Sequence, residues 1–174
     1  IQSFGLHFQK DFMTCPFIND EILNKIFGEK ADFVKETFLQ NSHDDIWEMR
    51  PEYNTQRKVE AWFAGKTDEE SVNMREGLYS LISNVLFVPD RKNPSTYHPR
   101  IAVQSDFIYD RLSDHEKDAF NRLYNHYYYQ RHNQFWYHEA MKKLPMLTQC
   151  TSMLVCGEDL GMVPDCVPWV MEQL

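Results

Sequence analysis

An acidic turn near the C-terminus carries the residues best suited to chemistry. An apolar run, residues 153–156, leads directly to Glu158 and Asp159, and Gly157 and Gly161 enclose this acidic pair. The run has the length and composition of a buried β-strand, and the glycines predict a turn at its end. Carboxylates just beyond the C-terminal ends of strands are the usual catalytic groups of α/β barrels. Glu158 is therefore the first candidate for an acid/base catalyst, although acidic turns of this kind also serve simply as helix N-caps.

A second candidate site lies in the polar segment 90–100. His98 and Arg100 stand two residues apart there, on a backbone that Pro94 and Pro99 restrict. An imidazole and a guanidinium in such a loop could contact a substrate hydroxyl or carboxylate. The alternative is that Arg100 simply pairs with a nearby acidic residue. We treat both residues as candidates for substrate binding.

The remaining histidines and the cysteines do not predict a metal site. His126, His132 and His138 recur every six residues in a segment that reads as one helix. Residues six apart on a helix point in different directions, so these imidazoles cannot converge on one ion. The four cysteines form no Cys-x-x-Cys pair. We expect no metal and no organic cofactor.

The elements that must position these residues are mainly helices. Caps, apolar faces and breakers predict helices over about 19–27, 31–39, 55–64, 67–83 and 113–144, and from about 164 onward. Asn19 is one expected cap, and Thr67 with Glu70 and Ser113 with Glu116 are expected capping boxes. Short strands are expected at 84–88 and 153–156. The predicted fold class is mainly α with minor β.

The loop 90–100 is the main predicted boundary. Residues 1–89 are all helical apart from one short strand, and we expect them to form a helical insertion subdomain. Residues 90–174 follow the order long helix, strand, acidic turn, helix, which is typical of a parallel α/β fold. The chain starts at Ile1 and stops at Leu174, within the last predicted helix. We therefore expect it to be a piece of a longer protein.

Composition and net charge argue against several classes of binding partner. The chain has 174 residues, 43% of them hydrophobic, which suffices for one core with or without a subdomain. Its formal net charge of −8 argues against nucleic acid, because neutralising phosphates needs a basic surface. No apolar stretch approaches the length of a membrane span and no signal peptide is recognised, so we expect no membrane partner. Cys150 and Cys156 lie in or beside apolar segments and are expected to be buried and reduced, in a cytoplasmic setting.

The segment from Tyr97 to Met171 resembles the 4-α-glucanotransferases, the amylomaltase or disproportionating-enzyme family. The resemblance is strongest to the large plant-cytosolic and bacterial type, which carries an insertion in its catalytic barrel. Residues 1–89 match more loosely. The matching stretches are Tyr97-His98-Pro99-Arg100, Asp114 with Lys117, Arg122-Leu123-Tyr124, Tyr127-Tyr128, Trp136, Ala140, Lys143-Leu144-Pro145, Cys156-Gly157-Glu158-Asp159-Leu160-Gly161 and Val163-Pro164.

The resemblance implies a (β/α)8 barrel of the α-amylase clan, of which this chain would hold a helix-strand-helix piece. It implies that Glu158 is the general acid/base and that α-1,4-glucans or maltose are the substrates. The family's nucleophilic aspartate belongs to an Arg-x-Asp-His segment, which this chain lacks, so the rest of the parent barrel would supply it. The third acidic residue belongs to a His-Asp segment after the acid/base, whereas His43-Asp44 precedes it here.

The chemistry of retaining glycosyl transfer agrees with this assignment. Two carboxyl groups about 5–5.5 Å apart are needed, one as nucleophile and one as acid and then base. Leu154, Val155 and Cys156 are expected to provide the apolar wall that keeps the acid protonated. Asp159 is too near Glu158 along the chain to be the nucleophile and is expected to cap the following helix, to orient Glu158 or to contact substrate. Two rival functions remain: a non-catalytic helical interaction or carbohydrate-binding module, and an α-glucan hydrolase of the same clan.

Overall fold

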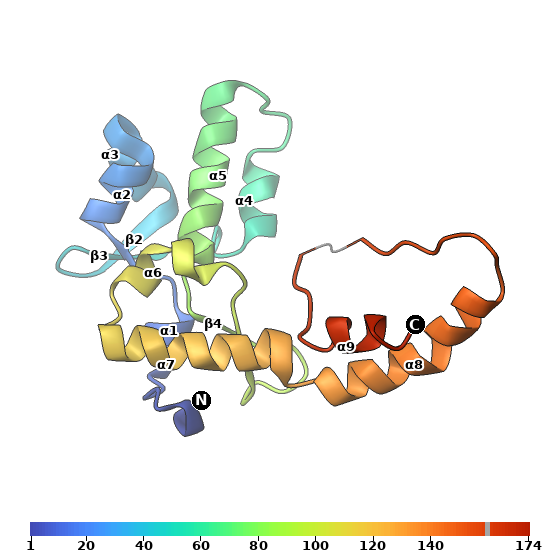
Figure 1. Cartoon of the computed structure of the whole chain (residues 1–174). Helices are drawn as coiled ribbons and strands as arrows, with labels where there is room; N and C mark the ends of the chain where they lie inside the picture. The colour runs from blue at the N-terminus through green and yellow to red at the C-terminus, as the bar shows by residue number, and fades with distance from the viewer. Residues whose placement is uncertain (159–160) are drawn as a thin grey trace. The chain divides into compact units, whose positions relative to one another are not determined.

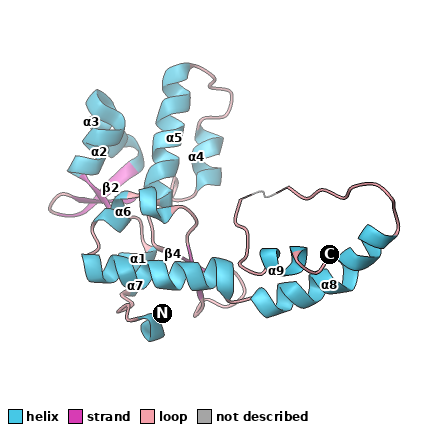
Figure 2. Cartoon of the chain, in the orientation of Figure 1, coloured by secondary structure: helices cyan, strands magenta, loops and turns pink. Residues whose placement is uncertain are grey.

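The computed structural model describes residues 1–158 and 161–174, and these residues are mainly helical (Figures 1 and 2). The chain divides into two compact units. One comprises Phe8–Ser113, and the other comprises Ile1–His7 with Asp114–Leu174. The predicted boundary at residues 89 and 90 lies inside the first of these. The composition of mainly α with minor β agrees with the sequence prediction.

The unit Phe8–Ser113 combines short helices with two small antiparallel sheets. Its elements in chain order are α1 (Lys10–Thr14), β1 (Ile18–Asn19), α2 (Asp20–Phe27), η2 (Gly28–Lys30), α3 (Ala31–Phe38), β2 (Leu39–His43), β3 (Ile46–Met49), α4 (Gln56–Trp62), α5 (Glu69–Ser83), β4 (Phe87–Pro89), β5 (Tyr97–Pro99), η3 (Val103–Ser105) and α6 (Phe107–Asp110). The sheets have the orders β1-β3-β2 and β4-β5.

Local capping explains several of these helices. The Asn19 side chain accepts a hydrogen bond from the Ile22 N–H at 3.0 Å, which starts α2 where the sequence predicts. The Thr55 side chain caps α4 in the same way. The predicted capping box at Thr67 is one residue early, because Asp68 is the residue that caps α5. Its carboxylate accepts from the Ser71 N–H at 2.8 Å.

The core of this unit lies where α2, α3, α4 and α5 meet. Its apolar side chains are contributed by these helices and by β1 and β2. The largest fully buried members include Phe38, Leu23, Leu78 and Leu81. Phe38 is the centre of an aromatic group, with its ring centroid 4.9 Å from those of Tyr53 and Trp62. Burial of these side chains supplies the main driving force for the unit.

The strands β1, β2, β3 and β5 were not expected from sequence. No strand was predicted around Trp47, yet β3 pairs with both β1 and β2. Segment 90–100 was taken as a loop, yet Tyr97–Pro99 pairs with Phe87–Pro89. These strands are very short, so their local pattern is weak, and they form only through pairing with another strand, next along the chain for β2–β3 and β4–β5 and more distant for β1–β3.

The second unit is built around a helix that changes geometry along its length. Its elements are η1 (Gln2–Phe4), α7 (Asp114–Asn125), the π-helical turn η4 (His126–Gln130), α8 (Asn133–Gln149) and α9 (Val167–Met171). The continuous helix predicted over 113–144 is therefore wrong in two respects. The helix breaks at residues 131 and 132, and α8 continues past Pro145 to Gln149.

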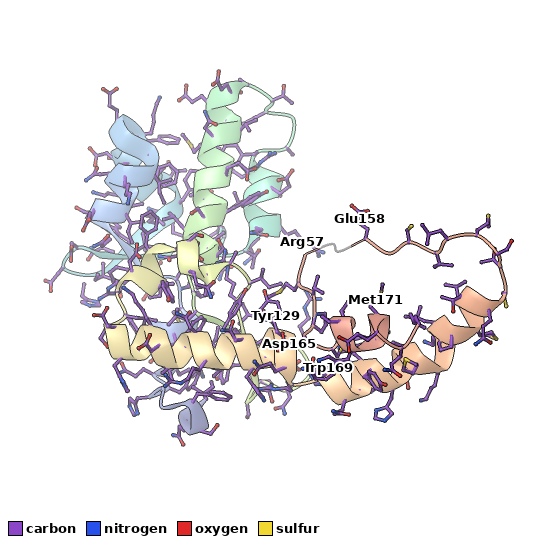
Figure 3. The ribbon with its side chains drawn as sticks, in the orientation of Figure 1. Arg57, Tyr129, Glu158, Asp165, Trp169 and Met171 are labelled. Carbon is purple, nitrogen blue, oxygen red and sulfur yellow. The ribbon has the colours of Figure 1, made fainter. Side chains whose placement is uncertain are left out.

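A tertiary hydrogen bond accompanies the break. The Arg131 N–H donates to the His126 carbonyl at 2.7 Å, the i→i+5 bond of a π-turn. The Tyr129 carbonyl accepts from the Asp165 N–H at 3.0 Å, so a segment far along the chain satisfies it. Figure 3 labels both residues. The helical sequence pattern around Tyr129 does not predict a hydrogen-bond donor so far along the chain.

Candidate functional site

Glu158 lies in the long connection between α8 and α9. Residues 152–158 are irregular in structure and mostly exposed, and the Glu158 side chain points away from the connection into solvent (Figure 3). The second acidic residue of the turn, Asp159, lies outside the described residues. Gly161, which follows the turn, has a φ of 77°, in the left-handed region that glycine adopts without strain.

The strand predicted at residues 153–156 is absent. A parallel strand must exchange backbone hydrogen bonds with neighbouring strands, and every described regular element of this unit is a helix. Without a ladder the run stays extended in solvent, and Met153 and Leu154 are 76% and 89% exposed. Cys150 and Cys156 are exposed as well, so their predicted burial is wrong.

The apolar wall expected around Glu158 is therefore not formed within this unit. Leu154, Val155 and Cys156 precede the carboxylate in sequence, but they do not enclose it. A general acid near neutral pH relies on burial against apolar neighbours to keep its proton. Glu158 comes directly after the apolar run, as the sequence predicts. Apolar neighbours that would favour its protonated form would have to come from other chain segments.

The helices on either side of the connection pack on each other and leave an apolar hollow. α8 and α9 lie side by side (Figure 1), and Cys166 and Val170 of the α9 region are buried. The hollow encloses about 380 Å³. Its lining is almost wholly apolar and consists of Trp136, Ala140, Leu144, Pro164, Cys166, Val167, Val170 and Met171. It offers no polar group that could activate a substrate.

His98 is held by an acidic residue at the start of the β4–β5 loop. The His98 Nε2 atom lies 2.9 Å from Asp90 Oδ2. The Asp90 carboxylate also accepts hydrogen bonds from the N–H groups of Lys92 and Asn93, both at 2.7 Å. The hydrogen bond with His98, followed by these two backbone bonds, lowers the pKa of Asp90 below its usual value. His98 thus helps to order the turn between two strands.

Arg100 forms an ion pair with Asp106, as the structural alternative for this residue predicted. Its Nη1 atom donates to Asp106 Oδ2, and its backbone N–H donates to the Leu86 carbonyl at 2.9 Å. Desolvation by burial raises the pKa of Asp106, and the charge of Arg100 opposes that rise. Arg100 therefore links the segment after β5 to the start of α6.

The candidate residues fall into different units. His98 and Arg100 belong to Phe8–Ser113, whereas Glu158 belongs to the unit that contains α7, α8 and α9. The contacts of His98 with Asp90 and of Arg100 with Asp106 therefore lie within the unit Phe8–Ser113. A nearby acidic partner was expected for Arg100 but not for His98, although Asp90 and Asp106 both stand within eight residues of the side chains they bind.

The described residues contain no group of three or more His, Cys, Asp or Glu side chains placed to hold a metal ion. Among the same residues, no helix has the length and apolar character needed to cross a membrane. Tyr128 has a strongly raised pKa. Burial, followed by the neighbouring Tyr124 and Tyr127, raises the pKa of Tyr128 to about 12, so its hydroxyl remains protonated at neutral pH.

Comparison with known proteins relates the chain to one protein family. The family profile described as 4-alpha-glucanotransferase matches residues 34–174. The chain is 31% identical over 169 residues to 4-alpha-glucanotransferase DPE2 of Oryza sativa subsp. japonica. That alignment covers 94% of this chain and 18% of the rice protein, so the chain spans under a fifth of its relative. No solved structure matches the chain. The chain belongs to the 4-alpha-glucanotransferase family.

Proposed function

We propose that the protein containing this chain transfers α-1,4-glucan segments, such as glucosyl or maltosyl units, between maltose, malto-oligosaccharides or larger glucans. The observation that carries the proposal is the family match over residues 34–174, which includes the Cys156-Gly157-Glu158-Asp159-Leu160-Gly161 motif. The relative aligned over almost the whole chain has the same family name.

In this proposal Glu158 is the general acid and then the general base of a retaining mechanism. It first gives its proton to the glycosidic oxygen of the leaving sugar, while an aspartate outside this chain attacks the anomeric carbon. The two carboxyl groups must lie about 5–5.5 Å apart for the covalent glycosyl intermediate to form. Glu158 then takes the proton of the acceptor hydroxyl, which attacks the intermediate and completes the transfer.

The remaining candidate residues have supporting roles. Asp159 is assigned to orienting Glu158 or contacting the sugar, because adjacent carboxylates cannot reach the anomeric carbon from opposite sides. For His98 and Arg100, the observed pairs with Asp90 and Asp106 support a role in shaping the loop that carries them. Direct contact of either side chain with substrate remains part of the proposal.

The assignment of segments belongs to the same proposal. Residues 1–89 would be an insertion, and residues 90–174 would be the part of the (β/α)8 barrel that carries the acid/base strand. The exposed apolar run at Met153 and Leu154 supports a position that barrel neighbours cover. The four cysteines are all free, which supports the reducing compartment expected for a cytoplasmic enzyme.

Substitution of Glu158 in the full-length protein tests the mechanism. Glu158→Gln keeps the size of the side chain but cannot transfer a proton, so kcat on maltose should fall by about 10²–10⁴-fold. The glucan affinity should change little, and Asp159→Asn should cost less than Glu158→Gln. Glucosyl fluoride needs no protonation of its leaving group, so it should partly restore formation of the glycosyl intermediate in Glu158→Gln.

Two results would contradict the proposal. Near-normal turnover of maltose by Glu158→Gln, with loss in Asp159→Asn, would move the acid to the other carboxyl. Conversion of maltotriose to only glucose and maltose, without products longer than maltotriose, would identify the same-clan hydrolase instead. Product analysis by anion-exchange chromatography separates these outcomes.

A further inference from the structure

The unit Phe8–Ser113 contains a polar-rimmed hollow that the reaction at Glu158 does not use. The hollow encloses about 680 Å³. It is lined by parts of α1, the segment before β1, the β2–β3 hairpin and the end of the segment before α4. None of its lining residues is a reacting group of the mechanism proposed above.

Half-buried apolar side chains form the floor of the hollow. Phe12, Phe17 and Trp47 contribute aromatic rings, and Ile46 and Met49 add aliphatic surface. The Trp47 ring is fixed by its Nε1–H, which donates to Asp20 Oδ1 at 2.7 Å. The Phe17 ring is covered on one face by the Arg111 guanidinium, 3.6 Å from the ring centroid. The floor is therefore anchored before any ligand binds, which lowers the cost of ordering on binding.

Exposed polar side chains form the rim. Strand β2 contains a bulge, since Asn41 faces Trp47 and His43 faces Ile46, which leaves Ser42 as the extra residue. The Ser42 hydroxyl donates to Glu48 Oε1 at 3.0 Å, and His43 Nδ1 lies 3.4 Å from the Ser42 oxygen. The bulge thus directs a connected row of hydrogen-bonding groups to one edge of the hollow.

The turn beside this row is in an uncommon conformation. Asp44 has a φ of 47°, in the left-handed region that few residues other than glycine adopt. β-bulges and residues in such backbone regions are both enriched at binding and active sites. Here they occur in adjacent positions, at the residues that present His43 to the hollow.

The chemistry of the lining selects a neutral, hydroxyl-rich ligand. None of the residues described in the lining of the hollow is Lys or Arg, because Arg111 and Lys35 are engaged on aromatic rings of the floor. Asp11 and Glu48 in the lining are acidic, so phosphates and nucleic acids are disfavoured. Sugar rings present apolar C–H faces that can lie on aromatic rings, and hydroxyls that exchange hydrogen bonds with carboxylate, imidazole and amide groups. A mostly apolar floor with a few convergent polar groups is the usual design of such pockets.

We propose that this hollow is a binding site for an α-1,4-glucan chain, with Trp47 as the stacking platform and His43 and Glu48 as hydrogen-bonding partners of the sugar hydroxyls. The choice of an α-1,4-glucan among carbohydrates rests on the proposed function. The site would hold long glucans during successive transfers, so its loss should weaken binding of polymers and leave the reaction on maltose intact.

The test uses the full-length protein with His43→Ala combined with Glu48→Gln. Both side chains are exposed, so the fold does not depend on their burial. Loss of two hydrogen bonds to the sugar should weaken binding of maltoheptaose about tenfold. Isothermal titration calorimetry measures this loss, and reduced retardation in native gels that contain glycogen shows it independently. The kcat and KM for maltose disproportionation should stay unchanged.

Glu52→Gln is the matched control, because Glu52 is an exposed carboxylate close in sequence to the hairpin but absent from the lining. Trp47→Ala is the second variant, and its far-ultraviolet circular dichroism shows whether it folds. A folded Trp47→Ala protein should lose at least as much glucan affinity as the double variant.

Three results would overturn the proposal. The first is unchanged glucan affinity in the double variant and in folded Trp47→Ala. The second is an equal loss in Glu52→Gln. The third is tight binding of tetralysine with no binding of maltoheptaose, because an acidic rim would then serve a cationic peptide. If the wild-type protein lacked maltose turnover, the proposed function would fail separately, because glucan binding and maltose turnover are measured by different assays.

Discussion

The motif around Glu158 predicts a role for its carboxyl group but not the environment of that group. The motif places an acid after an apolar run, and the family match makes that acid the proposed catalyst. The surroundings that would keep it protonated depend on neighbours, and here the preceding side chains are exposed. The proposed role of Glu158 therefore rests on sequence, and its protonation as a general acid would require apolar neighbours beyond those in this unit.

Asp20 is a carboxylate whose surroundings the structure does define. It lies 3.0 Å from the Lys35 ammonium and accepts a hydrogen bond from the Trp47 indole at 2.7 Å. The hydrogen bond from Lys35, followed by that from Trp47, lowers the pKa of Asp20 below its ordinary value of 3.8. Asp20 therefore links α2 to α3 and to the central strand β3.

We expect Asp20→Asn to destabilise the chain at neutral pH and to have progressively less effect in acid. The folded-state pKa is depressed, so the stabilisation is fully present above the unfolded-state pKa and is lost as pH falls through the folded-state pKa. Because the Asp20 side chain is 45% exposed, solvent screening limits the effect to about 1 kcal/mol or less.

Urea unfolding of wild type and Asp20→Asn at pH 7 and below pH 3.8 measures this difference. Asp118→Asn serves as the control, because Asp118 is exposed on α7 and the variant removes one charge in the same way. A stability difference that stays constant with pH would show that the ionised carboxylate of Asp20 is not responsible.

At the scale of elements, helices with a local cap were predicted well. Asn19 and Thr55 start α2 and α4 at the expected positions, because a side chain that bonds a backbone N–H three residues on acts within one turn. Contacts between helices set further requirements that no local pattern reveals. The clearest is at Gly77 on α5, which faces the end of α2.

Gly77 permits a close approach of α5 to α2. A Cβ atom at this position would lie 2.5 Å from Phe27 Cε1 and 2.9 Å from Ile26 Cγ2, nearer than real Cβ contacts. We expect Gly77→Ala to lower the free energy of unfolding by about 1–3 kcal/mol from overpacking, despite the better helix propensity of alanine.

Chemical denaturation measures the effect of Gly77→Ala. Combining it with Phe27→Leu removes the ring edge that meets the new methyl group, so the double variant should lose less than the sum of the single variants. Strict additivity, or a Gly77→Ala protein more stable than wild type, would show that α2 moves aside without cost.

At the scale of the whole molecule, the chain consists of two units, and it spans 18% of its rice relative. Its exposed apolar run at residues 153–156 lacks strand partners among the described elements. Such a run is expensive to leave in water, since burying apolar surface gives about 25 cal/mol per Å². The enzyme activity proposed above therefore belongs to the longer protein.

We expect the 174-residue chain by itself to have no transferase activity, because it lacks the family's nucleophile segment and one carboxyl group cannot complete the two-step reaction. Incubation with maltotriose, followed by chromatography of the sugars, measures this. The full-length protein is the positive control. Redistribution of maltotriose into shorter and longer oligosaccharides by the chain alone would contradict both the assignment and the mechanism.

The sequence by itself determined the family, the position of Glu158 in its motif, and the helices whose caps and apolar faces lie within a few residues. These features depend on local chemistry, which a sequence displays directly. Only the tertiary structure decided the hairpin β2–β3, the break after η4 and the partners of His98 and Arg100. Each of these depends on a specific partner in space that no periodic pattern marks: Asp90 and Asp106 stand only a few residues from His98 and Arg100, whereas the Asp165 N–H that satisfies the Tyr129 carbonyl comes from far along the chain. The same reason explains the missing strand at 153–156, because a strand exists only when another strand accepts and donates its hydrogen bonds.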